Sequence, residues 1–188
     1  MEFVTLTKEE FREFSMKHPM ANFMQTTDLG DLKSNNGIKI DYVGVKKKGK
    51  LLCATLLEEE PSILGKKVFY APRGFLIDYH NKELLKFFTD NLKTYIKKRK
   101  GFKLTIDPNL VYQVRGADGS IMPKSQKDDE SFKNLCDLGF EHFGFNLYLE
   151  ARQVRFAYRM MLDEPYDVKK QEFSKSTRKN LESTYKKG

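Results

Sequence analysis

Short segments in which apolar and polar residues alternate, or apolar residues run together, are spread along the chain. A period of two residues is typical of a half-buried strand, and a short apolar run between turn residues is typical of a buried one. The lysine-rich turn KKKGK, residues 46–50, joins the first two segments into a hairpin. The pattern predicts strands over residues 38–45, 51–57, 66–71, 102–106, 140–149 and 154–162.

Helices are predicted where apolar residues recur three or four positions apart. Thr7 and Glu10 form a capping box at the start of the first helix, whose buried side would carry Phe11, Phe14 and Met16. The remaining helices are expected over residues 27–33, 81–98, 130–138 and 166–188.

The order of these elements predicts the fold class. Antiparallel neighbours come first and single crossover helices come later. This order is typical of an α+β fold with a mixed, largely antiparallel sheet flanked by helices on both faces. After the strand at residues 154–162 and the basic helix, the sequence predicts no further element against which they could pack. We therefore expect a first domain over residues 1–150 and the start of a second domain over residues 151–188.

Composition narrows the class of protein. The 188 residues carry a net charge of +8, which indicates either an anionic partner or a basic, well-solvated surface without one. Cys53 and Cys136 are too few for a disulfide framework or a four-thiolate zinc site, and both are expected to be reduced and packed. His18, His80 and His142 lack ligand-like spacing, so we expect no metal and no catalytic histidine.

The apolar runs also bear on localisation. Residues 1–11 are acidic and polar where a signal peptide would be basic and then apolar. No apolar run approaches the roughly 18 residues that a membrane span needs. We expect a cytoplasmic protein that at most makes peripheral contact with the inner membrane surface.

Five motifs carry a family resemblance. They read NFMQTTDLGDLK, YAPRGFLIDYHNKELLKFF, KLTIDPNLVYQ, LGFEHFGF and EFSKSTRKNLESTYKKG. Taken together and in this order, from Met1 to Gly188, they resemble the Fem family of peptidoglycan aminoacyltransferases. Each motif alone is weakly specific, whereas five in register are a strong signal.

The resemblance implies a fold and a reaction. Family members have two domains with the fold of GCN5-type (GNAT-like) acetyltransferases, but they use no coenzyme A. They transfer an amino acid from aminoacyl-tRNA to a stem-peptide or bridge amine of a peptidoglycan precursor, either lipid II or UDP-MurNAc-pentapeptide. Here the second domain would be truncated before the family's helical arm. Its acceptor-binding Arg and Tyr and its catalytic Lys would be absent, so this fragment is expected to be inactive alone.

Lys33 is the best site residue that the resemblance carries over. It follows Gln25 and the triplet Asp28-Leu29-Gly30, and the family's first-domain acceptor contact is the lysine of this pattern. A lysine suits a diphosphate as a mobile point charge, and the free N–H groups of the short helix would lie near it. On the residues alone, a solvated surface lysine is the common alternative.

Two turns offer further candidate chemistry. Asp107 precedes Pro108 at a strand end, so it would serve either as the base that deprotonates the acceptor amine or, as we favour, as a cap of the next turn. Arg73 and Gly74 match a turn of the family except for Phe75, which stands where proline is usual. The arginine would face an acceptor phosphate or form a structural ion pair. The turn lacks the second glycine of a coenzyme A pyrophosphate loop.

The other candidates lie in a loop and in the C-terminal segment. Tyr112 and Arg115 belong to the long loop of residues 109–128 and are candidate substrate-contacting residues. The last helix either presents a solvated basic face or binds an anionic partner in a salt-sensitive way. That partner would be the tRNA backbone or anionic lipid. The candidate tRNA-binding residues of this helix are Lys175, Arg178, Lys179, Lys186 and Lys187. The alternative functions are a coenzyme-A-dependent acetyltransferase and an RNA-binding module without catalysis.

Overall fold

The computed structural model describes residues 1–116, 118–123, 125, 127–144, 161 and 163–187. Two compact units divide the chain, Met1–Phe143 and Gly144–Gly188, and each is described by itself. That the second unit begins another domain of the same fold stays a prediction.

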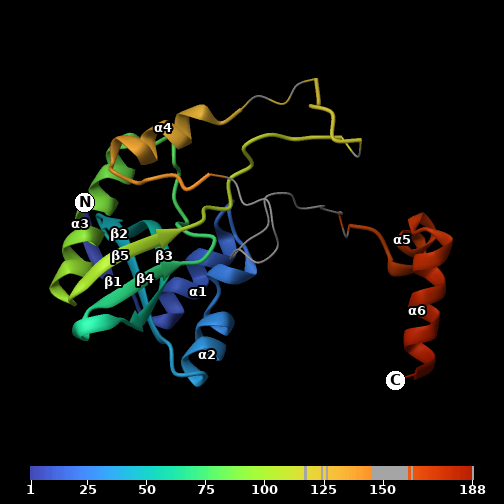
Figure 1. The fold of residues 1–188 in the computed structure, drawn as a ribbon, viewed down its shortest axis with the longest axis horizontal. Coiled ribbons are helices and arrows are strands. Elements are labelled where there is room, and N and C mark those ends of the chain that lie inside the picture. Colours follow the sequence, from blue (N-terminus) through green and yellow to red (C-terminus); the bar gives the residue numbers. More distant parts are fainter. Residues whose placement is uncertain (117, 124, 126, 145–160, 162, 188) are drawn as a thin grey trace. The chain divides into compact units, whose positions relative to one another are not determined.

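The first unit is built on a five-stranded sheet in which the strands lie side by side in chain order (Figure 1). Three neighbouring pairs are antiparallel and the last pair, β4 with β5, is parallel. The predicted mixed, largely antiparallel sheet of an α+β fold is therefore confirmed. The strands are β1 (Glu2–Thr5), β2 (Lys39–Lys47), β3 (Lys50–Pro61), β4 (Lys67–Ala71) and β5 (Gly101–Ile106).

Helices cover both faces of this sheet (Figure 1). Side chains of α3 pack with Val43, Val45 and Cys53 in the larger core, whereas Phe11 of α1 packs with Leu56 on the opposite face. These contacts follow from the alternation of side chains along a strand. The helices are α1 (Lys8–Lys17), α2 (Thr27–Asn35), α3 (Lys82–Lys98) and α4 (Asp129–Asp137), with short 3-10 turns η1 (Phe23–Gln25) and η2 (Ile63–Gly65).

Three local predictions are wrong. Strand β1 was not expected, because its four residues are too short for a visible alternation, yet Phe3 pairs with Val45 at the edge of β2. Met16 is 68% exposed, and Ser15 takes the buried position on α1. Cys136 is exposed on α4 rather than packed, while Cys53 is buried in β3 as expected, and both thiols are free.

The Pro-Arg-Gly turn ends strand β4 at Ala71, and pairing with β3 resumes beyond it at a single bridge. Leu76 pairs with Ala54 of β3 through two backbone hydrogen bonds of 3.0 and 3.1 Å. Both apolar runs around the turn thus lie against β3, and residues 72–74, here called the 72–74 turn, stand out from the ladder.

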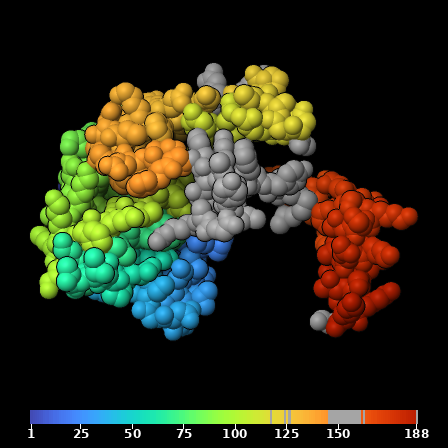
Figure 2. Space-filling model, in the orientation of Figure 1, coloured from blue at the N-terminus to red at the C-terminus, as the bar shows by residue number. Residues whose placement is uncertain are grey.

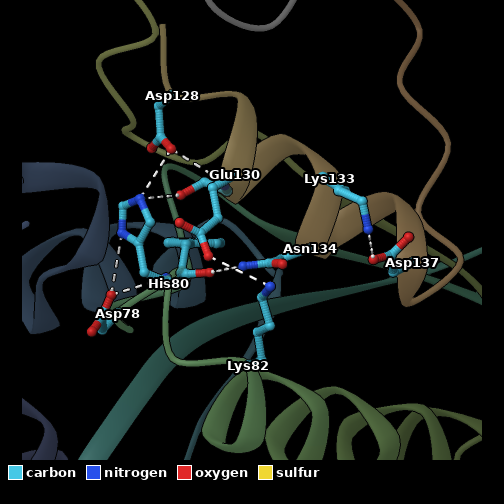
Figure 3. A network of polar contacts seen from close by, with 10 residues as sticks. Asp78, His80, Lys82, Asp128, Glu130, Lys133, Asn134 and Asp137 are labelled. Atoms are coloured by element: carbon cyan, nitrogen blue, oxygen red, sulfur yellow. Dashed lines mark hydrogen bonds and ion pairs between the residues drawn. The ribbon is translucent and has the colours of Figure 1, made fainter. Parts of the chain in front are cut away.

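Helix α4 is held against the segment that precedes α3 by polar contacts (Figure 3). The Asn134 side chain donates to the Tyr79 carbonyl at 2.9 Å, and the His80 ring lies 3.0 Å from an Asp128 carboxylate oxygen. Asp128 also caps α4 by accepting the Ser131 N–H. These contacts fix the far end of the long loop that follows β5.

The basic segment of the second unit forms two helices rather than the single one predicted. These are α5 (Tyr166–Glu172) and α6 (Lys175–Lys187). The break has a local cause, because the Ser174 hydroxyl accepts the Thr177 N–H at 3.2 Å and starts a new helix.

The last two predicted strands fall largely outside the described residues. Residues 140–144 are described and form no strand, whereas 145–149 lie outside the described part. Of the strand predicted over residues 154–162, only Met161 is described, and it belongs to no strand. No described helix is long and apolar enough to cross a bilayer.

Candidate functional site

Gln25 holds the 72–74 turn against β3. Its side chain is fully buried, and its Nε2 donates to the Pro72 carbonyl at 2.6 Å. Its Oε1 accepts the Leu56 N–H at 2.8 Å and the Thr55 hydroxyl at 3.2 Å. The amide therefore replaces the ladder hydrogen bonds that the turn interrupts. A side chain at Gly74 would place its Cβ 2.7 Å from the Thr55 hydroxyl, so only glycine fits.

Asp107 anchors the outer side of the same turn. One carboxylate oxygen accepts the Arg73 N–H at 2.7 Å, and the other accepts the Tyr70 hydroxyl at 3.0 Å. Arg73 has φ 51°, in the left-handed region that non-glycine residues rarely adopt, and these contacts hold it there. Among the described residues the Arg73 guanidinium makes no ion pair, so the structural ion pair considered for this arginine is not found there. A contact between Arg73 and an acceptor phosphate stays a prediction.

Lys33 lies on α2 above the sheet. Its ammonium is 3.2 Å from a carboxylate oxygen of Glu58 in β3, and the two side chains are 31% and 2% exposed. Lys33 belongs to the last turn of α2, so the expectation of free helix N–H groups beside it is wrong. Those groups lie at the other end of the helix, where the Thr26 hydroxyl accepts the Leu29 N–H.

Helix α2 is pressed onto the sheet at Gly30. A Cβ at this position would collide with the Tyr42 hydroxyl of β2, so the glycine permits the close approach that brings Lys33 to Glu58. Burial raises the pKa of Tyr42 to about 12, and the carboxylates of Asp31 and Asp28 add to the effect. Tyr42 is therefore a neutral, packed support for the helix.

A continuous polar row results on the α2 face of the sheet. Glu58 and Tyr70 are direct cross-strand partners in β3 and β4, so the row runs from Lys33 through both of them to Asp107 and the Arg73 backbone. The fold thus brings together four of the predicted site residues, namely Lys33, Arg73, Gly74 and Asp107. A partly exposed cation at one end of this row is suited to an anionic group.

Sequence reasoning did not single out Glu58, Tyr70 and Gln25 as site residues. The run of three glutamates at the end of β3 suggests an exposed strand end, but Glu58 is buried. The signal that could have found it is the period of two, which places Glu58 on the same face as Leu56. Gln25 entered only as part of the pattern before Lys33.

Arg115 is engaged within its own loop, and Tyr112 contacts the first residue of α4. The Tyr112 hydroxyl donates to Asp129 at 3.0 Å, and Arg115 donates to the Gly119 carbonyl at 2.9 Å and to Gln113. These contacts order the loop locally. The role of both residues in substrate binding stays a prediction.

The predicted tRNA-binding residues all lie on α6, in the second unit. Helix α5 supplies ion pairs from Lys169 to Glu164 and Glu172 and from Lys170 to Glu182 of α6. Within the described part of the chain, the five candidates make no ion pair of their own. They are Lys175, Arg178, Lys179, Lys186 and Lys187.

A pocket lies apart from the polar row, and no metal-binding group is found among the described residues. A pocket of about 270 Å³ between α1 and the β2–β3 turn is lined by Glu10, Phe14, Lys46 and neighbouring residues, none of them a predicted site residue. In the described part of the chain, no group of three His, Cys, Asp or Glu residues is arranged to hold a metal ion.

Comparisons with known proteins identify the family. This chain is similar in fold to part of the solved structure titled "Crystal structure of FemX". That structure matches 100% of this chain and 44% of its own with a TM-score of 0.78 and 27% identity. A model of the FemAB family matches residues 6–188, and the chain belongs to this family.

The named relatives are longer than this chain. Aminoacyltransferase FemA of Staphylococcus aureus (strain bovine RF122 / ET3-1) is 38% identical over 165 residues, which is 87% of this chain and 39% of that protein. FemA of S. aureus strain NCTC 8325 / PS 47 gives the same values. The chain thus spans about two fifths of the curated relatives that it matches.

Proposed function

We propose that this chain is the acceptor-binding part of an aminoacyltransferase that builds peptidoglycan bridges. The donor would be an aminoacyl-tRNA and the acceptor an amine of a peptidoglycan precursor. Family membership and the identity to aminoacyltransferase FemA support the reaction class. The observation that carries the site is the Lys33 ammonium, partly exposed and held by the buried Glu58 carboxylate at the end of the polar row.

Lys33 would bind the diphosphate of the precursor. An ammonium is a compact charge that attracts phosphate oxygens, and its long stem lets it follow them. Glu58 would keep the ammonium on the α2 face until the acceptor arrives. The 72–74 turn would lie beside the bound acceptor, with its backbone fixed by Gln25 and Asp107.

The transfer itself needs little from the protein. The acceptor amine nitrogen attacks the ester carbonyl of the aminoacyl-tRNA and loses a proton as the amide forms. The bond to the ribose oxygen breaks, and that oxygen takes up a proton and leaves as the ribose hydroxyl of the tRNA. The ester is already activated, so positioning supplies much of the rate. The geometry favours Asp107 as a positioning residue, because both of its oxygens hold the turn.

The basic face of α6 would contact the tRNA backbone. Lys175, Lys179, Lys186 and Lys187 are exposed on this helix. Contacts with phosphates release counterions, so binding would weaken steeply with salt and would not depend on tRNA sequence.

A transfer assay tests the proposal. The longest reading frame that contains this chain is mixed with a pool of charged tRNAs and a lipid-linked peptidoglycan precursor, and the mass of the precursor is followed. We expect a gain of one amino-acid residue, and none with uncharged tRNA or with acetyl coenzyme A. No gain under conditions in which a known transferase works would contradict the proposed function.

A further inference from the structure

The β3–β4 turn exposes two large apolar side chains at its tip. Ile63 is 74% exposed and Leu64 is 92% exposed. Leu64 also has φ 54°, a left-handed conformation that a leucine adopts at a cost and that Asn or Gly adopts readily. Because Leu64 neither packs nor suits its backbone, folding of the unit gives no reason for a leucine here.

The start of β5 lies beside this turn and continues the surface. The Lys67 N–H donates to the Lys100 carbonyl at 3.1 Å, and the Lys66 ammonium lies 5.9 Å from the centre of the exposed Phe102 ring. Figure 2 shows the two segments next to each other on the surface. Together they form an apolar tip with a flank, here called the β3–β4 surface.

Exposed lysines lie directly after the turn and along the segment that runs from the last turn of α3 into β5. In the described part of the chain, none of them pairs with a carboxylate. They are Lys66, Lys97, Lys98, Lys100 and Lys103. Two nearby carboxylates are neutralised by other cations, because Glu59 is buried among Lys67 and Arg99, and Asp41 is bound by Arg99. Glu60 is the partly exposed acidic residue next to the turn.

We propose that the β3–β4 surface docks on an anionic phospholipid bilayer. Ile63, Leu64 and the Phe102 ring would enter the boundary between head groups and acyl chains, and the lysines of both segments would contact the lipid phosphates. Membrane-surface binding combines these two contributions, the burial of apolar area and attraction to anionic lipid. The charge of the surface is what selects an anionic bilayer over a neutral one.

The docking would place the candidate site close to the membrane. Glu58 and Ile63 are five residues apart, which is at most roughly 17 Å at a rise of about 3.3 Å per residue. The inference rests on the surface alone and does not depend on the transfer reaction.

Vesicle co-sedimentation of the complete chain tests the proposal. We expect binding to phosphatidylglycerol-containing vesicles, little binding to pure phosphatidylcholine, and release as the salt concentration rises from about 0.1 to 0.5 M. Leu64→Asn suits the left-handed backbone, so it should leave the thermal midpoint unchanged or raise it while weakening vesicle binding roughly tenfold.

The chain supplies a matched control for the lysines. Lys100 (φ 64°) and Lys48 (φ 50°) both occupy left-handed turn positions, but Lys48 lies in the β2–β3 turn at the other end of β3. Lys100→Asn should weaken vesicle binding about fivefold, whereas Lys48→Asn should not change it. Met16→Gln changes an exposed apolar residue outside the β3–β4 surface and serves as the control for Leu64→Asn. This variant should bind vesicles as tightly as the unaltered chain.

Three outcomes would overturn the proposal. One is no binding of the unaltered chain to anionic vesicles. Another is an equal loss for Lys48→Asn and Lys100→Asn, which would indicate that total charge and not this surface decides binding. The third is unchanged vesicle binding by Leu64→Asn together with equally tight binding to heparin, which would indicate a site for soluble polyanions.

Discussion

Asp107 accepts hydrogen bonds through both carboxylate oxygens, from the Arg73 N–H and from the Tyr70 hydroxyl. A carboxylate used in this way fixes backbone, and it is poorly placed to collect a proton from a substrate. Gln25 has a comparable role on the inner side of the turn. At the scale of single residues, the site is thus built from polar side chains that hold the main chain.

The role of Asp107 can be tested by stability. Asp107→Ala removes two hydrogen bonds to a charged group and should lower the free energy of unfolding by about 2 kcal/mol, measured with urea. Asp107→Asn keeps an acceptor oxygen for Arg73 and should cost less than half of this. In the transfer assay Asp107→Asn should lower turnover only modestly. A loss of several orders of magnitude there would make Asp107 the base.

Gln25 offers a second test at the same scale. Gln25→Leu keeps an apolar stem of similar size but leaves the Leu56 N–H and the Pro72 carbonyl buried without their partner. The expected cost is about 3 kcal/mol in unfolding free energy, since each unsatisfied buried group costs about 1–3 kcal/mol. Asn22→Leu, in the less buried segment before η1, is the control. A Gln25→Leu protein as stable as this control would show that the turn needs no such support.

At the scale of elements, long and periodic segments could be predicted and local exceptions could not. The amphipathic pattern of α3 gives the buried Leu85, Phe88 and Leu92 directly. The predicted end of strand β4 at Ala71 is confirmed, but the single bridge beyond the Pro-Arg-Gly turn could not be predicted. This bridge joins Leu76 to Ala54, which are 22 residues apart in the sequence, so no local pattern indicates it.

The candidate site shows the same division. The motif before Lys33 suggested this lysine as a site residue. Its ion-pair partner Glu58 lies in another element, and a contact between two elements cannot be predicted from the local sequence of either one. The prediction that Cys136 is packed was wrong for a related reason. The spacing of apolar residues predicts a helix, but it does not show which side of that helix other elements cover. The family resemblance thus suggested Lys33, Arg73 and Gly74, and the strand end suggested Asp107, but the contacts that join these residues could not be predicted, and their roles in binding stay predictions.

An ion cluster ties the ends of β2, β3, β4 and α3 together around Glu59. Burial alone would raise the pKa of Glu59, but the hydrogen bond from Lys67 and the charges of Arg99 and Lys39 outweigh it and hold the pKa below its ordinary value of 4.5. A carboxylate with a lowered pKa contributes stability that is fully present above pH 4.5 and is lost as the pH falls through the lower, folded-state value.

This gives a prediction about pH. The thermal midpoint of the unaltered chain should fall more steeply as the pH drops below 4.5 than that of Glu59→Gln, because the variant has lost the titrating group. Glu60→Gln changes the neighbouring glutamate of β3 and should follow the unaltered chain. Parallel curves for the unaltered chain and Glu59→Gln would contradict the account of the cluster.

At the scale of the whole molecule, the chain joins a folded sheet domain to a basic helical segment. The first unit carries the polar row and the β3–β4 surface, and the second carries the lysines of α6. Exposed lysines of the β3–β4 surface and of α6 contribute to the net charge of +8. The two surfaces are proposed to contact an anionic membrane and the tRNA backbone, respectively, whereas Lys33 of the polar row is proposed to contact the diphosphate of the acceptor.

In the proposed function, the polar row on the α2 face binds the acceptor through Lys33. Titration calorimetry with the soluble precursor UDP-MurNAc-pentapeptide measures this binding for the unaltered chain, Lys33→Ala and Lys8→Ala. Lys8 is a matched control, because it also forms a salt bridge near α2, to Asp31 at 2.5 Å. Circular dichroism melting establishes that each variant is folded.

We predict that Lys33→Ala binds the precursor at least about tenfold more weakly and that Lys8→Ala binds as the unaltered chain does. Equal affinities for a folded Lys33→Ala protein and the unaltered chain would contradict the account and remove Lys33 from the site.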